Sequence, residues 1–236
     1  MTTVQSASLE ARTTPPLSGT VRIVAGVSLA LAGILNGLPA YLSQILAGDM
    51  EYVDYIRWGA DNPGLAQTEQ LVYVVSMLFA PIGLLAMAQV TRWRAPVITA
   101  VAAPLFLWGM WGFQNILSFG YLTVSTATRS IGPEAAVRLN DGLAADASGL
   151  LISLAPHLLG SFVGLVLLSI ACWKSRAFSR TPIILLVVFL LWDFLLPAVG
   201  PLEPHILLIA AWVWLGIDLI RMPASVWRGE RPHVQG

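Results

Sequence analysis

Residues 182–205 read PIILLVVFLLWDFLLPAVGPLEPH, and the apolar run from Pro182 to Leu202 is interrupted by one carboxylate, Asp193. A run of this kind is typical of a membrane-spanning helix, which needs roughly 20 predominantly apolar residues. A charge inside such a helix costs roughly 2–3 kcal/mol or more unless it is paired, neutralised or hydrated. Asp193 is therefore a candidate functional residue within a segment that otherwise suits lipid.

The composition of the whole chain also indicates an integral membrane protein. Of its 236 residues, 56% are hydrophobic and only 11% are charged, whereas soluble domains carry about 25% charged residues. The formal net charge is zero, so nothing in the composition points to a nucleic-acid partner. The single cysteine, Cys172, excludes an intramolecular disulfide and any CxxC metal or redox motif.

Six segments are predicted to cross the membrane, which gives an all-α, polytopic six-transmembrane-helix bundle in contact with membrane lipids. These segments are residues 22–46, 70–90, 96–118, 149–172, 182–200 and 205–221. Residues 1–21 are expected to form a disordered cytoplasmic tail, residues 22–221 the membrane domain and residues 222–236 a second cytoplasmic tail.

Two of the predicted connections carry helical patterns of their own. In residues 48–64, Met50, Val53 and Ile56 recur at helical spacing, and in residues 132–149 Pro133 suits the first position of a helix. We expect two short amphipathic helices on the outer membrane surface. They either simply close the fold or form a lid over an outward-facing cavity.

The distribution of basic residues predicts the orientation. With six spans, the two tails and the second and fourth connections hold 10 of the 13 Lys and Arg residues, and the opposite side holds only Arg57, Arg129 and Arg138. Short basic loops stay in the cytoplasm. Both termini are therefore predicted to be cytoplasmic, in a plasma (inner) membrane.

Two ionisable residues are predicted to reach a similar depth in the membrane. At ~1.5 Å per helical residue, His157 lies about 12 Å from Gly149 and Asp193 about 10 Å from Gly200. They are candidates for a catalytic acid/base pair, for ligand contact, or for a purely structural bond between two spans. A fourth reading is that the two side chains face different directions.

Several further side chains in the outer half are candidates for ligand binding. They are Asn36, Trp108, Trp111, Gln114, Asn115, Trp192 and His205. Phe113 and Phe194 extend the predicted aromatic pocket. No metal site is predicted, because the histidines lack ligand spacing, and no cofactor is expected, because only His157 lies deep enough to bind haem.

Proline and glycine modify the predicted spans. Pro156 and Pro197 lack the N–H that would bond the carbonyls of Ile152 and Asp193. Gly160 and Gly164 form a GxxxG motif, which favours close packing within the chain and is also compatible with a homo-oligomer. Asp218 and Arg221 are expected to pair one turn apart at the inner membrane interface.

The order of these features resembles the bacterial six-span integral membrane proteins of unknown function. The resemblance covers nearly the whole chain and rests on the layout, on the basic turns QVTRWRAP (89–96) and WKSRAFSRTP (173–182), and on the closing segment WVWLGIDLIR (212–221). It implies a six-helix fold and a bacterial membrane, and it assigns no activity and no site residue.

Three functions are compatible with this sequence. The first is the binding of an apolar or amphiphilic small molecule in an outward-facing intramembrane cavity. The second is an intramembrane enzyme that acts on an isoprenoid or a lipid with His157 and Asp193 as acid and base. The third is a small secondary transporter, against which the apolar inner halves of the spans argue. No P-loop is present, so the chain is not itself an ATPase.

Overall fold

The computed structural model describes residues 19–48, 50–196 and 203–230, and within these ranges every regular element is helical. Four of the helices are long and apolar enough to cross a membrane: Gly19–Leu46, Pro63–Thr91, Pro96–Ile131 and Ala147–Ser175. This result supports a multi-pass membrane protein. The predicted tail at residues 1–21 lies almost wholly outside the described residues, and the first helix already begins at Gly19.

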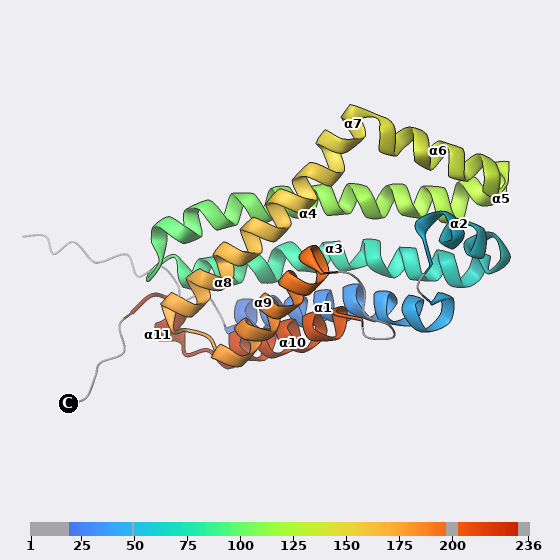
Figure 1. The fold of residues 1–236 in the computed structure, drawn as a ribbon. Coiled ribbons are helices and arrows are strands. Elements are labelled where there is room, and N and C mark those ends of the chain that lie inside the picture. The colour runs from blue at the N-terminus through green and yellow to red at the C-terminus, as the bar shows by residue number, and fades with distance from the viewer. Residues whose placement is uncertain (1–18, 49, 197–202, 231–236) are drawn as a thin grey trace, which may run out of the picture.

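The helices follow one another with short connections (Figure 1). Three stretches, labelled η, are wound as π-helix and continue the α-helices beside them. The elements are α1 (Gly19–Ala47), α2 (Tyr52–Asp61), α3 (Pro63–Thr91), α4 (Pro96–Gly120), η1 (Tyr121–Ala127), α5 (Thr128–Ile131), α6 (Pro133–Ala145), α7 (Ala147–Gly149), η2 (Leu150–Leu154), η3 (Pro156–Val163), α8 (Gly164–Ser175), α9 (Arg180–Leu195), α10 (His205–Arg221) and α11 (Ala224–Trp227).

The last two predicted spans are shorter helices than the other four. Helix α9 has 16 residues and α10 has 17, which at ~1.5 Å per residue falls below the ~30 Å hydrocarbon core. The predicted fifth span extended to residue 200, but α9 ends at Leu195, and Pro197 lies outside the described residues. The third predicted span is longer than expected, because its helix continues through η1 to Ile131.

Close helix contacts depend on glycine. Helix α1 packs mainly against α10 and α3, and α4 packs mainly against η3 and α8. A Cβ atom at Gly26 of α1 would collide with the backbone carbonyl of Gly216 in α10. A Cβ at Gly160 would likewise collide with the backbone of α4. The GxxxG motif at Gly160 and Gly164 therefore packs against α4 of the same chain.

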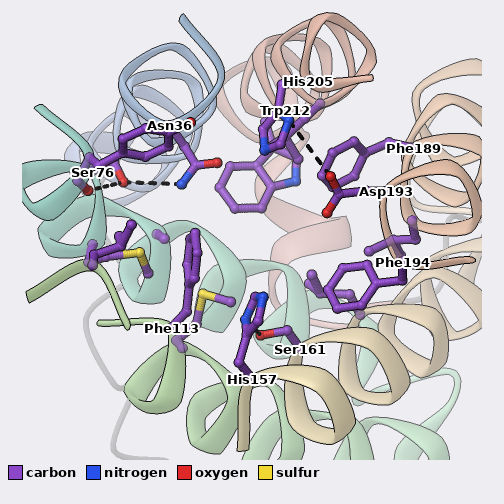
Figure 2. Close-up of a pocket in the computed structure, with 18 residues that line it drawn as sticks. Asn36, Ser76, Phe113, His157, Ser161, Phe189, Asp193, Phe194, His205 and Trp212 are labelled. Carbon is purple, nitrogen blue, oxygen red and sulfur yellow. Dashed lines mark hydrogen bonds and ion pairs between the residues drawn. The ribbon is translucent and has the colours of Figure 1, made fainter. Parts of the chain in front are cut away.

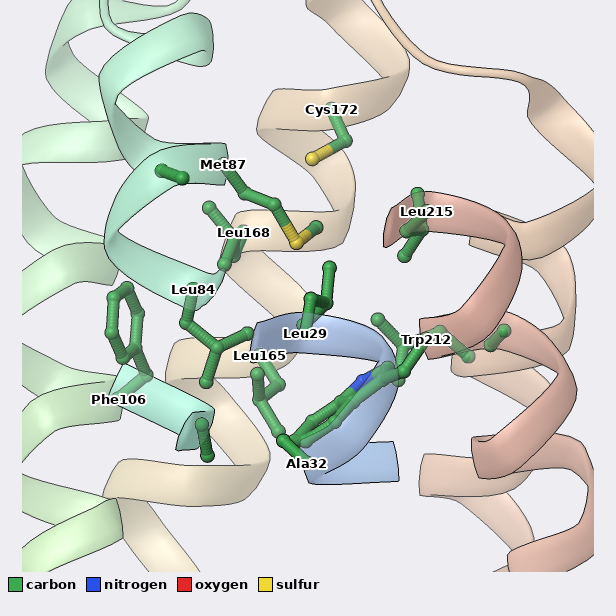
Figure 3. Packing of buried hydrophobic residues seen from close by; sticks show 14 of the residues in the cluster. Leu29, Ala32, Leu84, Met87, Phe106, Leu165, Leu168, Cys172, Trp212 and Leu215 are labelled. Carbon is green, nitrogen blue, oxygen red and sulfur yellow. The ribbon is translucent and has the colours of Figure 1, made fainter. Parts of the chain in front are cut away.

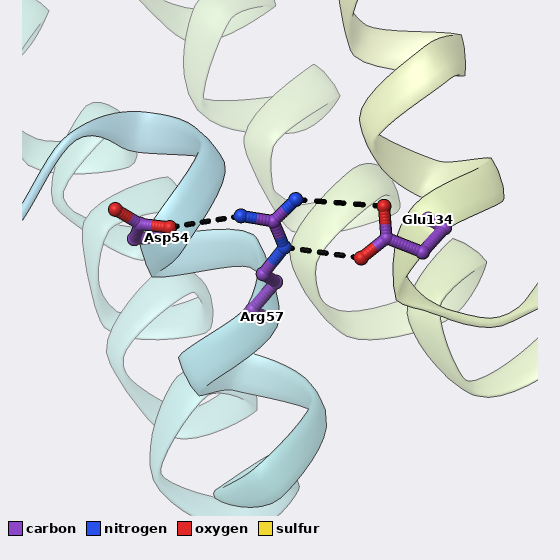
Figure 4. Close-up of polar contacts among 3 residues, drawn as sticks. All are labelled: Asp54, Arg57 and Glu134. Atoms are coloured by element: carbon purple, nitrogen blue, oxygen red, sulfur yellow. Dashed lines mark hydrogen bonds and ion pairs between the residues drawn. The ribbon is translucent and has the colours of Figure 1, made fainter.

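Helices α2 and α6 lie together at one end of the bundle, which we call the cap end (Figure 1). Ile56 of α2, Val124 of η1 and Ala136 of α6 form a small separate core there. Arg57 bridges the two helices through Glu134 at 3.1 Å and also contacts Asp54 at 3.0 Å (Figure 4). Both connecting segments are therefore helical.

The opposite end of the bundle carries most of the basic residues and α11 (Figure 1). The predicted tail begins with this short helix, and its Trp227 is buried in the main core. The expected Asp218–Arg221 pair does not form. Asp218 instead accepts hydrogen bonds from the backbone N–H and the hydroxyl of Ser179, at 2.8 and 3.1 Å. Because Ser179 precedes α9, this contact satisfies a free donor at the helix start.

The main core near this end is apolar. Figure 3 shows Leu29 of α1, Leu84 and Met87 of α3, Leu168 of α8 and Leu215 of α10 in contact around the helix crossings. Each of these side chains is at most 1% exposed. The polar groups considered below lie between this core and the cap end.

Candidate functional site

A cavity of about 250 Å³ lies between the helices at the level of Asp193. Side chains from α1, α3, α4, η3, α8, α9 and α10 line it, so every segment predicted to be a span contributes to its wall. Most of the lining is apolar, and a few polar groups lie at separate places around the wall (Figure 2). We call this cavity the chamber.

Asp193 contacts His205 across the chamber wall (Figure 2). Its carboxylate lies 3.8 Å from Nδ1 of His205, which is too long for a hydrogen bond. Nδ1 of His205 makes a close contact with Glu203 instead, and the backbone N–H of His205 donates to the same carboxylate at 3.2 Å. His205 thus stands between two carboxylates, with Phe189 packed against its ring at a centroid distance of 5.1 Å.

The expected pairing of His157 with Asp193 is wrong in its geometry. Both residues line the chamber, but no hydrogen bond or ion pair joins them among the described residues. The His157 ring stacks on Phe113 at 4.5 Å and tilts against Phe194 at 5.4 Å. Its Nδ1 lies 3.2 Å from the hydroxyl of Ser161, four residues along the same helix.

The backbone explains why the sequence placed His157 in the wrong direction. Depth was estimated from the rise of an α-helix, which also assumes ~100° of rotation per residue. Residues Leu150–Leu154 and Pro156–Val163 are π-helical, and wider turns rotate the following side chains by a different amount. Counting residues along each helix therefore predicts that His157 and Asp193 lie at a similar height. It does not predict the direction in which each side chain points around its helix axis.

Asn36 lies in the chamber wall, as predicted. Its side chain is 6% exposed, and its amide nitrogen lies 3.5 Å from the hydroxyl of Ser76, at the limit of a hydrogen bond. That hydroxyl donates in turn to the backbone carbonyl of Tyr73 at 2.6 Å. The three groups form a short polar row on the wall opposite Phe194 (Figure 2).

Four other predicted ligand-binding residues lie elsewhere. Trp108 and Trp111 are 41% and 51% exposed on the outside of α4. Gln114 donates to Ser118 at 3.0 Å and lines a separate groove beside Trp111. Asn115 donates to the carbonyl of Ile152 at 2.7 Å. These four side chains are therefore not part of the chamber.

The contact made by Asn115 involves the carbonyl that Pro156 was predicted to leave without its α-helical donor. Proline at position 156 has no N–H, and Ile152 is the residue whose carbonyl would accept it in an α-helix. In the structure the side-chain amide of Asn115, from the neighbouring helix, occupies that acceptor. The polar side chain thus stabilises a helix contact instead of binding a ligand.

A second cavity, of about 450 Å³, adjoins the chamber on the cap side. The two cavities share Tyr73, Asp193 and His205 in their walls. This second cavity, which we call the vestibule, also includes Trp192, a predicted site residue. Together the two volumes fall within the range of roughly 300–1,000 Å³ that is typical of small-molecule sites.

Helix α2 covers part of the vestibule with two tyrosines. Tyr52 and Tyr55 line it, stack on each other at 6.3 Å, and Tyr55 also stacks on Trp58 at 5.5 Å. The hydroxyl of Tyr55 donates to Glu69 of α3 at 2.8 Å. Burial raises the pKa of Tyr52 to about 12, and burial, reinforced by Glu69, raises the pKa of Tyr55. Both phenols therefore stay protonated donors.

Sequence reasoning missed several residues of the site. Tyr73 and Glu69 were not singled out, although each is a polar residue on an apolar helix, one turn apart. That spacing was a usable signal, because residues four apart share a helix face. Trp212 also lines the chamber, while its buried side chain belongs to the main core. Within the described ranges, no group of three or more His, Cys, Asp or Glu residues could hold a metal ion.

No protein-family model, curated protein or solved structure matches this chain. The functional interpretation therefore depends on the chamber, the vestibule and the groups at their junction.

Proposed function

We propose that the chain is a six-span protein of a bacterial plasma membrane with both termini in the cytoplasm. The four long helices form the first four spans, and α9 and α10 complete the bundle as shorter fifth and sixth spans. The basic residues cluster at the α11 end, as the positive-inside rule requires of a cytoplasmic face. The cap end then faces outward, with α2 and α6 at the outer membrane surface.

The function supported best is the binding of an amphiphilic small molecule from the outer side. One observation carries this proposal: an apolar chamber inside the bundle adjoins a polar vestibule through Tyr73, Asp193 and His205. A hydrocarbon group fits the chamber, where burial of apolar surface is favourable. A polar group fits the junction and the vestibule, where it meets hydrogen-bonding side chains.

The arrangement also bears on the two other functions. A transporter needs a polar route to the α11 end, and the described core below the chamber is apolar (Figure 3). An intramembrane enzyme remains a second candidate because His205 lies between two carboxylates at the edge of the chamber. In that case His205, and not His157, is the acid or base that acts with Asp193.

Filling the chamber tests the proposal. Ala80 of α3 is 2% exposed and lines the chamber, so Ala80→Phe occupies the space that the hydrocarbon group would take. Leu78→Phe is the matched control, because Leu78 lies on the same helix and is 68% exposed. The readout is native mass spectrometry of the protein, purified in a nonionic detergent, for amphiphiles that copurify with it.

We expect a bound amphiphile with the wild type and with Leu78→Phe, and its loss with Ala80→Phe. If Ala80→Phe does not fold, Ala80→Leu replaces it in the test. Leucine adds less volume than phenylalanine, so we expect a partial loss of the bound amphiphile. The proposal is refuted if the chamber-filling variants keep the same bound mass at the same occupancy as the wild type.

A further inference from the structure

Carboxylates outnumber histidines among the side chains that line the chamber and the vestibule. Among the described residues that line the two cavities, Glu69, Asp193 and Glu203 carry carboxylates. None of the lining residues is Lys or Arg, and the basic side chains among them are those of His157 and His205. The site therefore favours a positively charged or neutral group over an anion, since like charges repel strongly in a poorly hydrated space.

Two of the three carboxylates already have hydrogen-bonding partners. Glu69 accepts from the hydroxyl of Tyr55 at 2.8 Å, and Glu203 accepts from the backbone N–H of His205 and contacts its ring. Asp193 has no hydrogen bond within the described part of the chain. Its carboxylate lies 3.8 Å from Nδ1 of His205, and its side chain is 28% exposed. Asp193 is thus the carboxylate that stays open to a ligand.

A second group in the same wall lacks a partner. Trp212 is only 4% exposed and lines the chamber, yet its indole Nε1 has no hydrogen-bond acceptor among the described residues. Figure 2 shows the nitrogen-bearing edge of this ring on the Asp193 side of the cavity. A buried donor is normally paired, so a ligand group at this point supplies an acceptor while it donates to Asp193.

Aromatic rings surround the same junction. Phe189, Trp212 and Tyr73 line the chamber around Asp193, and the ring of Phe189 packs against His205. Aromatic faces attract cations, and the attraction grows when the cation is removed from water. An alkylammonium group at Asp193 would therefore meet both a carboxylate and aromatic rings.

We propose that the amphiphile is a long-chain amine. This inference rests on the proposed function and specifies its ligand class. The protonated amine donates to the carboxylate of Asp193, the hydrocarbon chain enters the chamber, and a hydroxyl group next to the amine accepts from Nε1 of Trp212. Anionic amphiphiles, such as fatty acids, are excluded by the carboxylates and by the lack of Lys and Arg.

The test compares four probes that share one chain length. Dodecylamine, 2-aminododecan-1-ol, dodecan-1-ol and dodecanoate are titrated at pH 7 into the full-length protein in phosphatidylcholine nanodiscs. Empty nanodiscs give the baseline for partition into lipid, and the bound probe is counted by mass spectrometry after size-exclusion separation.

We expect dodecylamine to bind about 10-fold to 100-fold more tightly than dodecan-1-ol, because a gain in affinity of this size corresponds to one charge-assisted hydrogen bond. The amino alcohol binds more tightly still, and dodecanoate stays at the baseline. Asp193→Asn removes the preference for the amine and leaves dodecan-1-ol unchanged. Asp193→Glu retains part of the preference, and Glu134→Gln, outside both cavities, changes nothing.

The outcomes separate the two proposals. If dodecylamine and dodecanoate bind equally well and Ala80→Phe abolishes both, the chamber binds amphiphiles but the inference of a cationic ligand is wrong. If Asp193→Asn keeps the full preference for the amine, the inference is also wrong. If no probe exceeds the baseline of empty nanodiscs, the proposed function itself fails.

Discussion

The bond from Asn115 to Ile152 allows a quantitative test of how the helices hold together. Asn115→Ala removes the 2.7 Å hydrogen bond to the carbonyl of Ile152, to which Pro156, lacking an N–H, cannot donate. Hydrogen bonds between helices in membrane proteins contribute about 0.6 kcal/mol on average and up to about 1.7 kcal/mol. The short distance places this bond in the upper part of that range.

We therefore expect Asn115→Ala to lower the free energy of unfolding by about 1–1.7 kcal/mol. The assay is reversible unfolding in mixed micelles by titration with a denaturing detergent. Pro156→Ala restores an N–H four residues after Ile152, so in that background Asn115→Ala should lower the free energy by a smaller amount. The two substitutions are thus predicted to couple.

Two results would refute this reasoning. One is an unfolding free energy that Asn115→Ala leaves unchanged. The other is an equal loss in the wild-type and the Pro156→Ala backgrounds, which would show that the two residues act independently. Gln114→Ala is the matched control, since Gln114 bonds only to Ser118 within its own helix.

Three further predictions concern other parts of the molecule. Gly26→Ala should lower the unfolding free energy by about 1–3 kcal/mol, measured in the same micelles, because its Cβ collides with the carbonyl of Gly216. His157→Phe should bind the dodecyl probes as the wild type does, because a phenyl ring can replace the imidazole in the stacking on Phe113. A loss of binding would contradict a packing role for His157. Burial raises the pKa of Glu203, but the hydrogen bond and charge of His205 outweigh burial and lower it overall. This lowered pKa contributes stability that is present above about pH 4.3 and is lost as the pH falls through the pKa of the folded state. The melting temperature of Glu203→Gln should therefore decline less than that of the wild type when the pH is lowered.

Much of the fold was readable from the order of residues. Pro63, Pro96 and Pro133 each start a helix, because proline suits a position whose N–H has no acceptor. The two connecting helices and the depth of the polar groups were also predicted. Such features depend on local backbone chemistry and on distance along one helix.

Span lengths were predicted less well. The sequence pattern joined Pro182 to Gly200 as one span, whereas the helix ends at Leu195. The next residue, Leu196, directly precedes Pro197 in the sequence. The residue before a proline is pushed out of helical geometry. Hydropathy averages do not register this effect, since alanine, valine and leucine continue the apolar run.

The sequence alone indicated that Asp193, His157, Asn36 and His205 lie in the same half of a helical bundle, and the structure shows all four in the wall of one cavity. Only the tertiary structure decided which of them meet. The π-helical turns around His157 and the packing of α10 against α1 direct His157 toward Phe113 and His205 toward Asp193. Depth follows from counting residues along a helix, whereas facing direction depends on helix winding and on close packing between distant segments.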